Sequence, residues 1–188
     1  PDGSTGLTGV VAIMCGQHFS AALRSNGTVV AWGDNDNGQL GDSSTTDRTL
    51  PVEVKDLGGT GILSGVESIA GGTDHTLVLK TDGTVWAWGL NNYGQLGDGT
   101  TTGRTSPVQV KGPGGSGWIT DVISIAAGSR HSVALKSDGS LWAWGNNWQG
   151  CLGDGTWTDR NTPVQVKGSG GDGWISSIVE VEAGTSFT

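Results

Sequence analysis

The chain has 188 residues, of which 35 are glycine and nine are tryptophan, while charged residues make up only 15%. With 34% hydrophobic residues it is neither a disordered polyelectrolyte nor a membrane-spanning chain, because no apolar run reaches the length of a span. A net charge of −8 argues against nucleic acid and anionic membranes as default partners, because both select basic surfaces. This composition predicts many short strands joined by tight turns.

An internal repeat with a period of 56 residues dominates the sequence. Residues 66–121 align with residues 122–177 without a gap, at 34 identical positions. Residues 10–65 form an earlier copy at the same offset, and residues 178–188 form a partial fourth copy. We therefore predict that residues 1–188 are one segment built from about 3.4 repeats.

Each repeat predicts four short strands, and a turn signal separates the second strand from the third. In the second copy that turn contains Asp82-Gly83, which predicts a type I′ hairpin with positive φ at both central residues. Pro107 is placed at the start of the fourth strand, where a missing N–H is tolerated. The four strands of this copy are expected at residues 66–70, 75–80, 84–88 and 107–111. Four antiparallel strands in a repeat of this length predict an all-β fold of β-propeller blades.

Three motifs in each copy together carry a family resemblance. In the second copy, residues 71–75 end in Gly-x-x-His, residues 79–91 are LKTDGTVWAWGLN, and residues 94–98 are GQLGD. The combination closely resembles the regulator of chromosome condensation repeat, a family whose fold is a seven-bladed propeller. The resemblance covers almost the whole chain and implies about 3.4 blades of a seven-bladed propeller.

The number of blades bears on what the chain must contact. Seven blades need about twice the residues present here, so these repeats cannot close a ring alone. Three arrangements stay open: a fragment of a larger propeller, a chain that closes by pairing with a second copy, and an open arc held by a different partner. Uncovered blade faces expose apolar surface and unpaired strand edges. We therefore expect further blades of the same parent chain, a second copy or another subunit to cover both ends.

Residues that recur in phase are predicted to be structural. His75 and His131 share their phase with Phe19, and a position that accepts phenylalanine is a packing position with room for an imidazole. The ring nitrogens would then bridge neighbouring blades by hydrogen bonds, rather than bind a metal or catalyse. The structural positions are Phe19, His75, His131, Trp32, Trp88 and Trp144, and Trp118 and Trp174 in the connectors are expected to plug the space between blades.

Sequence signatures of catalysis and of metal binding are absent. The chain has no nucleophile elbow, phosphate loop, zinc-protease motif or dinucleotide fingerprint, so we predict neither an enzyme nor a cofactor. Residues 34–38 resemble a calcium loop, but the glycine comes one position early and no glutamate follows at the twelfth position, so a turn is predicted. Cys15 and Cys151 lack zinc spacing and are too few for a disulfide framework.

Positions that differ between the copies mark the candidate binding surface, because a repeated frame leaves recognition to its loops. Nine of the ten basic residues recur in phase and are assigned to the blade scaffold; Arg130 is the exception. Trp148 and Trp157 have no counterpart, so each is either a partner contact, as tryptophan often is at binding hot spots, or a local packing residue. The candidate partner-binding residues are His18, Asp74, Arg130, Asn92, Tyr93, Trp148 and Trp157.

We expect a non-catalytic protein-binding or scaffold module whose partner is held by inter-strand loops on one propeller face. The alternatives are a carbohydrate-binding or adhesion unit, in which exposed tryptophans stack on sugars, and a purely structural repeat of a larger assembly. The glycine-rich connectors at residues 114–118 and 170–174 resemble the bacterial, exported branch of the family. That resemblance implies an extracellular or cell-surface location, with the periplasm as a further possibility.

Overall fold

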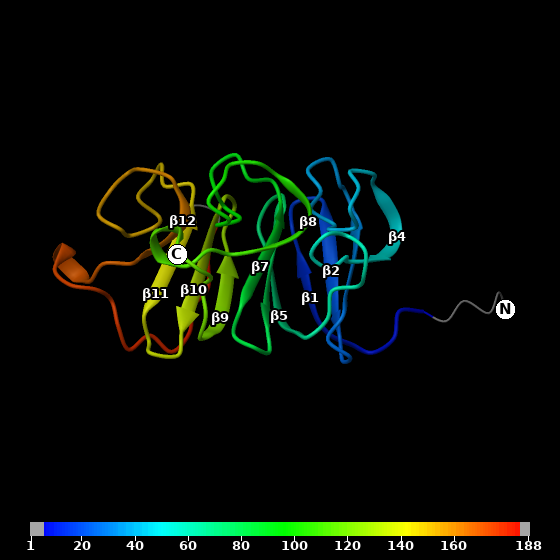
Figure 1. Cartoon of the computed structure of the whole chain (residues 1–188), viewed down its shortest axis with the longest axis horizontal. Coiled ribbons are helices and arrows are strands. Elements are labelled where there is room, and N and C mark those ends of the chain that lie inside the picture. Colours follow the sequence, from blue (N-terminus) through cyan, green and yellow to red (C-terminus); the bar gives the residue numbers. More distant parts are fainter. Residues whose placement is uncertain (1–5, 185–188) are drawn as a thin grey trace.

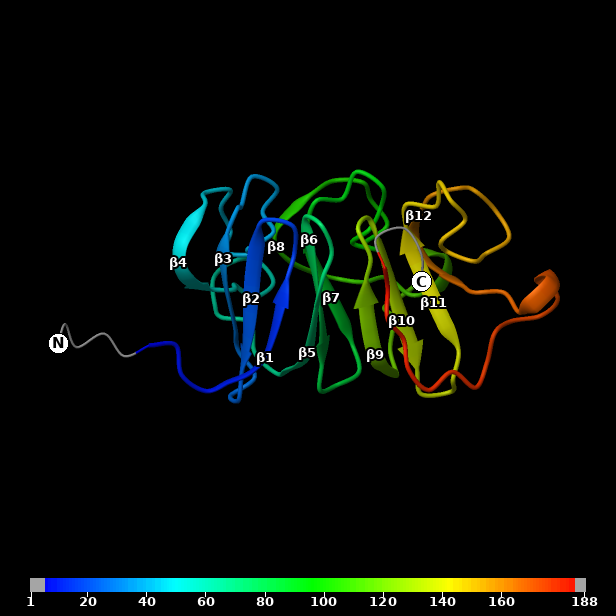
Figure 2. The ribbon, with the colours of Figure 1, turned by 180° about the vertical axis from the view of Figure 1, so that it is seen from behind.

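Three four-stranded antiparallel sheets make up the fold in the computed structural model, which describes residues 6–184. Figures 1 and 2 show the three sheets standing side by side as successive blades. Blade 1 contains β1 (Val10–Cys15), β2 (Phe19–Arg24), β3 (Val29–Gly33) and β4 (Arg48–Glu53). Blade 2 contains β5 (Val66–Gly71), β6 (His75–Lys80), β7 (Val85–Gly89) and β8 (Arg104–Gln109). Blade 3 contains β9 (Val122–Ala127), β10 (His131–Lys136), β11 (Leu141–Gly145) and β12 (Arg160–Gln165).

The architecture confirms the prediction of all-β propeller blades, and each blade restarts 56 residues after the last, at Val10, Val66 and Val122. The described residues form only two short 3₁₀ helices, η1 (Pro113–Gly115) and η2 (Ser169–Gly171), both in connectors. Over residues 6–184, no helix has the length and apolar character needed to cross a membrane.

The predicted hairpin between the second and third strands is present, but its turn differs from the type I′ expectation. In blade 2 the Gly83 N–H donates to the Lys80 carbonyl at 2.9 Å, and within this turn only Gly83 has a positive φ, of +75°. This geometry is a type I turn followed by a left-handed glycine. Asp82 accepts hydrogen bonds from the Thr84 N–H and hydroxyl, which accounts for an aspartate before the glycine.

The fourth strand begins three residues earlier than predicted, at Arg104 in blade 2. Pro107 therefore lies inside β8 instead of at its start. It is tolerated because β8 is an edge strand and its pairing register with β7 shifts between Ala87 and Gly89. The sequence pattern obscured this start because Arg104-Thr105-Ser106 is polar.

The hydrophobic core lies between blades. One cluster combines Leu40 and Val54 of blade 1 with Val78 and Trp88 of blade 2. A second cluster combines Leu96 of blade 2 with residues of blade 3 in the same way. Blade 2 therefore buries both sheet faces, whereas within residues 6–184 blades 1 and 3 each have a neighbouring blade on one side only.

Trp118, in the connector between blades 2 and 3, does not plug the space between them, which corrects that expectation. Trp118 and Trp174 are both about half exposed. The Lys111 ammonium lies 4.2 Å from the centroid of the Trp118 ring, and this contact holds the indole on the blade surface. It is η1 that reaches the next blade, where it contacts β12.

Candidate functional site

The antiparallel order brings two kinds of loop to the same end of every blade. Connections from first to second strand and from third to fourth strand must leave a sheet at one end, which is uppermost in Figure 1. Backbone hydrogen bonds link these loops in a row, from Gln17 N–H to Thr73 O and from Thr73 N–H to Ser129 O, both at 3.1 Å. We call this surface the loop face; it comprises residues 16–18, 34–47, 72–74, 90–103, 128–130 and 146–159.

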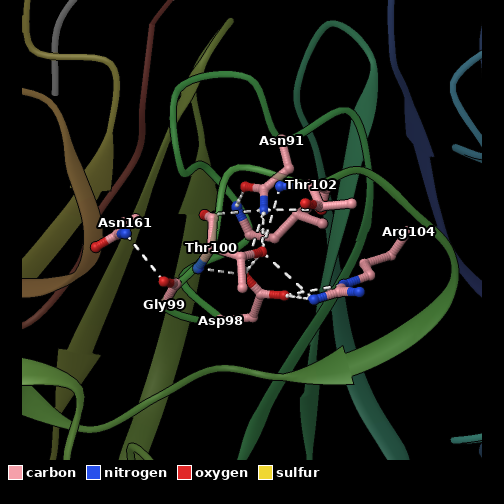
Figure 3. A network of polar contacts seen from close by, with 8 residues as sticks. Asn91, Asp98, Gly99, Thr100, Thr102, Arg104 and Asn161 are labelled. Atoms are coloured by element: carbon pink, nitrogen blue, oxygen red, sulfur yellow. Dashed lines mark hydrogen bonds and ion pairs between the residues drawn. The ribbon is translucent and has the colours of Figure 1, made fainter.

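A buried asparagine fixes each long loop between the third and fourth strands. In blade 2 the Asn91 amide donates to the carbonyls of Thr100 and Thr102 at 3.2 and 3.0 Å and to the Asp98 carboxylate at 3.2 Å. Its side-chain oxygen accepts the Leu96 N–H at 2.9 Å. Figure 3 shows Asn91 at the centre of this network, with Arg104 approaching Asp98 from the side. One fully buried amide thus holds both ends of the loop together.

An ion pair extends the network at its base. The Arg104 guanidinium donates to Asp98 at 2.6 Å. Burial alone would raise the pKa of Asp98, but hydrogen bonds from Thr100 and Arg104 outweigh it and hold the pKa below its usual value. The Asn161 side chain of β12 donates to the Gly99 carbonyl at 3.0 Å, so the loop is also held by the next blade. Matching asparagine, aspartate and arginine residues make the same contacts in the other blades: Asn35, Asp42 and Arg48, and Asn147, Asp154 and Arg160.

On this fixed frame, two predicted contact residues from different blades meet. The Arg130 guanidinium carbon lies 5.2 Å from the centroid of the Tyr93 ring, and Arg130 donates a hydrogen bond to the tyrosine hydroxyl at 3.2 Å. Tyr93 comes from the long loop of blade 2 and Arg130 from the short loop of blade 3. The neighbouring Asn92 side chain is exposed.

Trp148 shares a hollow with the arginine of this pair. A hollow of about 220 Å³ on the loop face is lined by Arg130, Trp148 and Cys151, among other residues. The Trp148 side chain is 77% exposed and Trp157 is 74% exposed, so neither serves to fill the loop interior. A Cβ on Gly150 would lie 3.3 Å from the Trp157 ring, which places that indole over the glycine.

The remaining candidates, His18 and Asp74, form a charged extension of the same surface. His18 is exposed and Asp74 is half-buried. Burial, followed by the Asp34 carboxylate, raises the pKa of Asp74, while His18 and Arg130 act in the opposite direction. Asp74 therefore lies within electrostatic range of both His18 and Arg130.

The two in-phase histidines lie away from solvent. His75 Nε2 lies 3.0 Å from the Ser132 hydroxyl of the next blade, and that hydroxyl donates to the Gln95 carbonyl at 2.7 Å. Since the single hydroxyl proton is already used, the imidazole must donate through Nε2. Burial lowers the pKa of His75 to about 3 and that of His131 to about 4, so both rings are neutral at neutral pH. Phe19 is buried at the same phase.

Acidic side chains gather in the first long loop, where carboxylate oxygens of Asp34, Asp36 and Asp47 come within 4.8 Å of one another. Asp34 accepts hydrogen bonds from the Asp36 N–H and the Gln39 amide, and Asp47 accepts the Asn35 N–H. Asp34 and Asp47 therefore help to hold the loop in shape through these hydrogen bonds. The copies in blades 2 and 3 do not keep this trio.

These blades, each with a buried loop asparagine and joined by the inter-blade tryptophans Trp88 and Trp144, define a β-propeller repeat protein. The chain belongs to the regulator of chromosome condensation (RCC1) repeat family: the family profile matches residues 26–79, 82–135 and 138–188. A second profile of the same repeat matches residues 10–39, 66–95 and 122–151.

Known relatives are considerably longer than this chain. It is 31% identical to the ultraviolet-B receptor UVR8 of Arabidopsis thaliana over 98% of its own length and 41% of the receptor. It is 32% identical to the human E3 ubiquitin-protein ligase HERC2 over 94% of its length, but only 4% of that protein. The crystal structure of Prp20p from Saccharomyces cerevisiae matches with a TM-score of 0.68 and 26% identity, over 87% of this chain and 40% of Prp20p.

The buried loop asparagines were not predicted as functional or structural positions. Their signal in the sequence is recurrence: Asn35, Asn91 and Asn147 are 56 residues apart, as are the aspartates and arginines that complete the network. Recurrence alone does not say which loop carbonyls an amide reaches. That information required the folded loop.

Proposed function

We propose that this segment is a non-catalytic protein-binding module whose partner contacts the loop face around Tyr93, Arg130 and Trp148. One observation carries the proposal: an arginine that contacts a tyrosine ring also lines a hollow with a largely exposed tryptophan, and all three positions differ between the repeats. Tryptophan, tyrosine and arginine are the residues enriched at binding hot spots. The buried asparagine network holds the loops that carry Tyr93 and Trp148, so little conformational freedom is lost on binding.

The relatives support a protein partner. The structure reports on Prp20p concern its binding to Gsp1p and histones, and a complex of Kap60 with yeast RCC1 (Prp20). Protein binding by this fold therefore has precedent, while the partner of this chain is set by its own loops. The scaffold arginines are paired with aspartates, which leaves Arg130 as the distinctive cation of the loop face.

The test places a photo-cross-linking amino acid at position 148 and, as a matched control, at position 118, which is an exposed tryptophan outside the loop face. We expect a protein adduct from position 148 in lysate of the source organism, lost when Tyr93→Ala and Arg130→Ala are combined, and none from position 118. An adduct that is indifferent to the double substitution would contradict the proposal. Glycan-array binding that is lost in Trp148→Ala would favour the carbohydrate-binding alternative.

An exported, cell-surface setting in a bacterium is a separate proposal. Its support is the resemblance of the connectors at residues 114–118 and 170–174 to the exported branch of the family. Protease shaving of intact cells that carry the natural gene with an epitope tag tests it. Loss of the tag signal is expected, and a signal that disappears only after lysis would contradict it.

A further inference from the structure

In the long loop of blade 1, carboxylates of the chain itself satisfy two hydrogen-bond donors. The Gln39 amide donates through Nε2 to Asp34 at 3.0 Å, and the Asn35 backbone N–H donates to Asp47 at 2.8 Å. Carboxylate oxygens of Asp34 and Asp47 come within 4.8 Å of each other. The two donors therefore point toward one small region of the loop face.

The long loop of blade 2 has the same backbone frame but no carboxylate in this region. Leu90 stands at the position of Asp34, and Gly103 stands at the position of Asp47. Neither side chain can accept a hydrogen bond. The N–H of residue 90 nevertheless donates to the short-loop carbonyl of its own blade at 2.8 Å, as the N–H of residue 34 does at 3.0 Å.

Blade 2 keeps both donors. Gln95 is 1% exposed, and its Oε1 accepts the Tyr93 N–H at 3.0 Å. The corresponding Gln39 Oε1 accepts the Asn37 N–H at 2.9 Å, so the two amides are oriented alike. Among residues 6–184 the Gln95 Nε2 has no hydrogen-bond partner, and the Asn91 N–H loses the aspartate that accepts it in the other two blades. An unpaired buried donor costs stability, so these two donors point to an acceptor supplied by a ligand.

The charge that faces this region is also reversed between the two blade boundaries. Burial, followed by the Asp34 carboxylate, raises the pKa of Asp74, so these two side chains lie within electrostatic range across the boundary of blades 1 and 2. The equivalent pair at the next boundary is Leu90 and Arg130. A cation therefore faces the loop that lacks the carboxylates, and Arg130 also lines the hollow that it shares with Trp148.

We propose that the Gln95 amide, the Asn91 N–H and Arg130 together bind a carboxylate of the protein partner, from an aspartate or glutamate side chain. The ligand takes the place that loop carboxylates hold in blade 1, and the half-buried Leu90 side chain turns aside to admit it. A carboxylate is the anion of choice because the equivalent amide and N–H of blade 1 bind carboxylates. The inference rests on the proposed function and names the chemical group that the partner presents.

The test uses acetate as the probe carboxylate and acetamide as its neutral match, at constant ionic strength. Nuclear magnetic resonance of the isotope-labelled protein follows the side-chain amide of Gln95 and the backbone amide of Asn91. Leu90→Asp supplies a carboxylate from the chain itself, as Asp34 does in blade 1. Leu90→Ala is the matched control, because it shortens the same side chain without adding an acceptor.

We expect both resonances to shift saturably with acetate and not with acetamide. Leu90→Asp should weaken acetate binding at least about tenfold, the change that corresponds to roughly one charge-assisted hydrogen bond, because its own carboxylate occupies the donors. Leu90→Ala should bind acetate at least as tightly as the wild type. The aspartate variant should also have the higher urea midpoint of the two, since the buried Gln95 amide gains a partner.

Three results would overturn the proposal: shifts that do not saturate, equal acetate affinity in Leu90→Asp and Leu90→Ala, or tighter binding of inorganic phosphate than of acetate. Photo-cross-linking from position 148 separates this site from the proposed function, and we expect Leu90→Asp to remove the adduct. An adduct that survives Leu90→Asp but is lost in the Tyr93→Ala and Arg130→Ala double variant would overturn the carboxylate site and leave protein binding at the loop face standing. If position 148 gives no adduct at all, the proposed function fails, whereas the acetate titration still decides whether the loop binds a carboxylate.

Discussion

Asn91 shows how much structure a single buried amide can organise. Its side chain forms hydrogen bonds with two loop carbonyls, a carboxylate and a backbone N–H. The Asn91 side chain itself is fully buried. We predict that Asn91→Ala lowers the free energy of unfolding by about 2–4 kcal/mol, because several buried groups lose their partner together. Asn92→Ala is the matched control, since that side chain is exposed. Urea unfolding checks this, and equal midpoints for the two variants would contradict it.

The buried histidines give the second prediction at this scale. The imidazole pKa is about 3 for His75 and about 4 for His131 in the fold, against about 6.5 in the unfolded chain. Below pH 6.5 only the unfolded state takes up these protons, so stability falls as the pH drops toward 4. The free energy of unfolding is expected to fall by about 1.4 kcal/mol per pH unit for each histidine. Above pH 7 the two rings contribute no pH dependence, since they are neutral in both states.

Phenylalanine at positions 75 and 131 tests whether the two imidazoles cause the loss of stability at acid pH. The substitution should fit, because Phe19 already occupies the equivalent position in blade 1. His75→Phe with His131→Phe should keep the fold and flatten the stability profile between pH 6.5 and pH 4. Asn92→Ala, at an exposed position without an ionisable group, should leave that part of the profile unchanged. Denaturant midpoints measured across this range decide the matter. A profile in the double variant as steep as in the wild type would assign the acid sensitivity to other groups.

At the scale of the strand and loop, sequence pattern succeeds where periodicity alone decides the structure. The strand β6 has the predicted bounds because a short apolar run, Leu77 to Leu79, is followed at once by a turn signal. The start of β8 was missed because three polar residues pair with an irregular part of β7. The turn type was missed because Asp-Gly also suits a type I turn in which aspartate accepts from the following threonine.

Tryptophans at equivalent positions of the third strands should contribute differently to the free energy of unfolding, because their neighbours differ. Trp144 on β11 is fully buried and bonded to blade 2, whereas Trp32 on β3 is half-buried at an open face. We predict that Trp144→Ala costs about 3–5 kcal/mol of stability and Trp32→Ala clearly less, since less surface is uncovered. Chemical denaturation of the two variants checks the difference. Equal losses would mean that the blade 1 face is covered in solution.

Across the molecule, comparison of the repeats located the variable loop positions, and the fold explains why some of them meet. Tyr93 and Arg130 are 37 residues apart in sequence but come from loops of adjacent blades at the same end. Periodicity predicted the blades, but the contact depends on side-chain directions across a blade boundary. Trp157, equally distinctive in sequence, instead lies over Gly150.

Blade 2 differs from its neighbours because both of its faces are covered, by blade 1 and by blade 3. In a repeat protein, stability is close to a sum of unit and nearest-neighbour interface contributions, so a terminal unit opens more readily than a central one. We predict that amide hydrogen exchange is slowest in β6 and β7, and faster at the corresponding positions of β2 and β3 and of β10 and β11. The measurement requires a concentration at which sedimentation shows a monomer, so that no second copy covers the open faces. Equally slow exchange in all three blades would show that they unfold as one unit, and that interface burial in this arc does not set local stability.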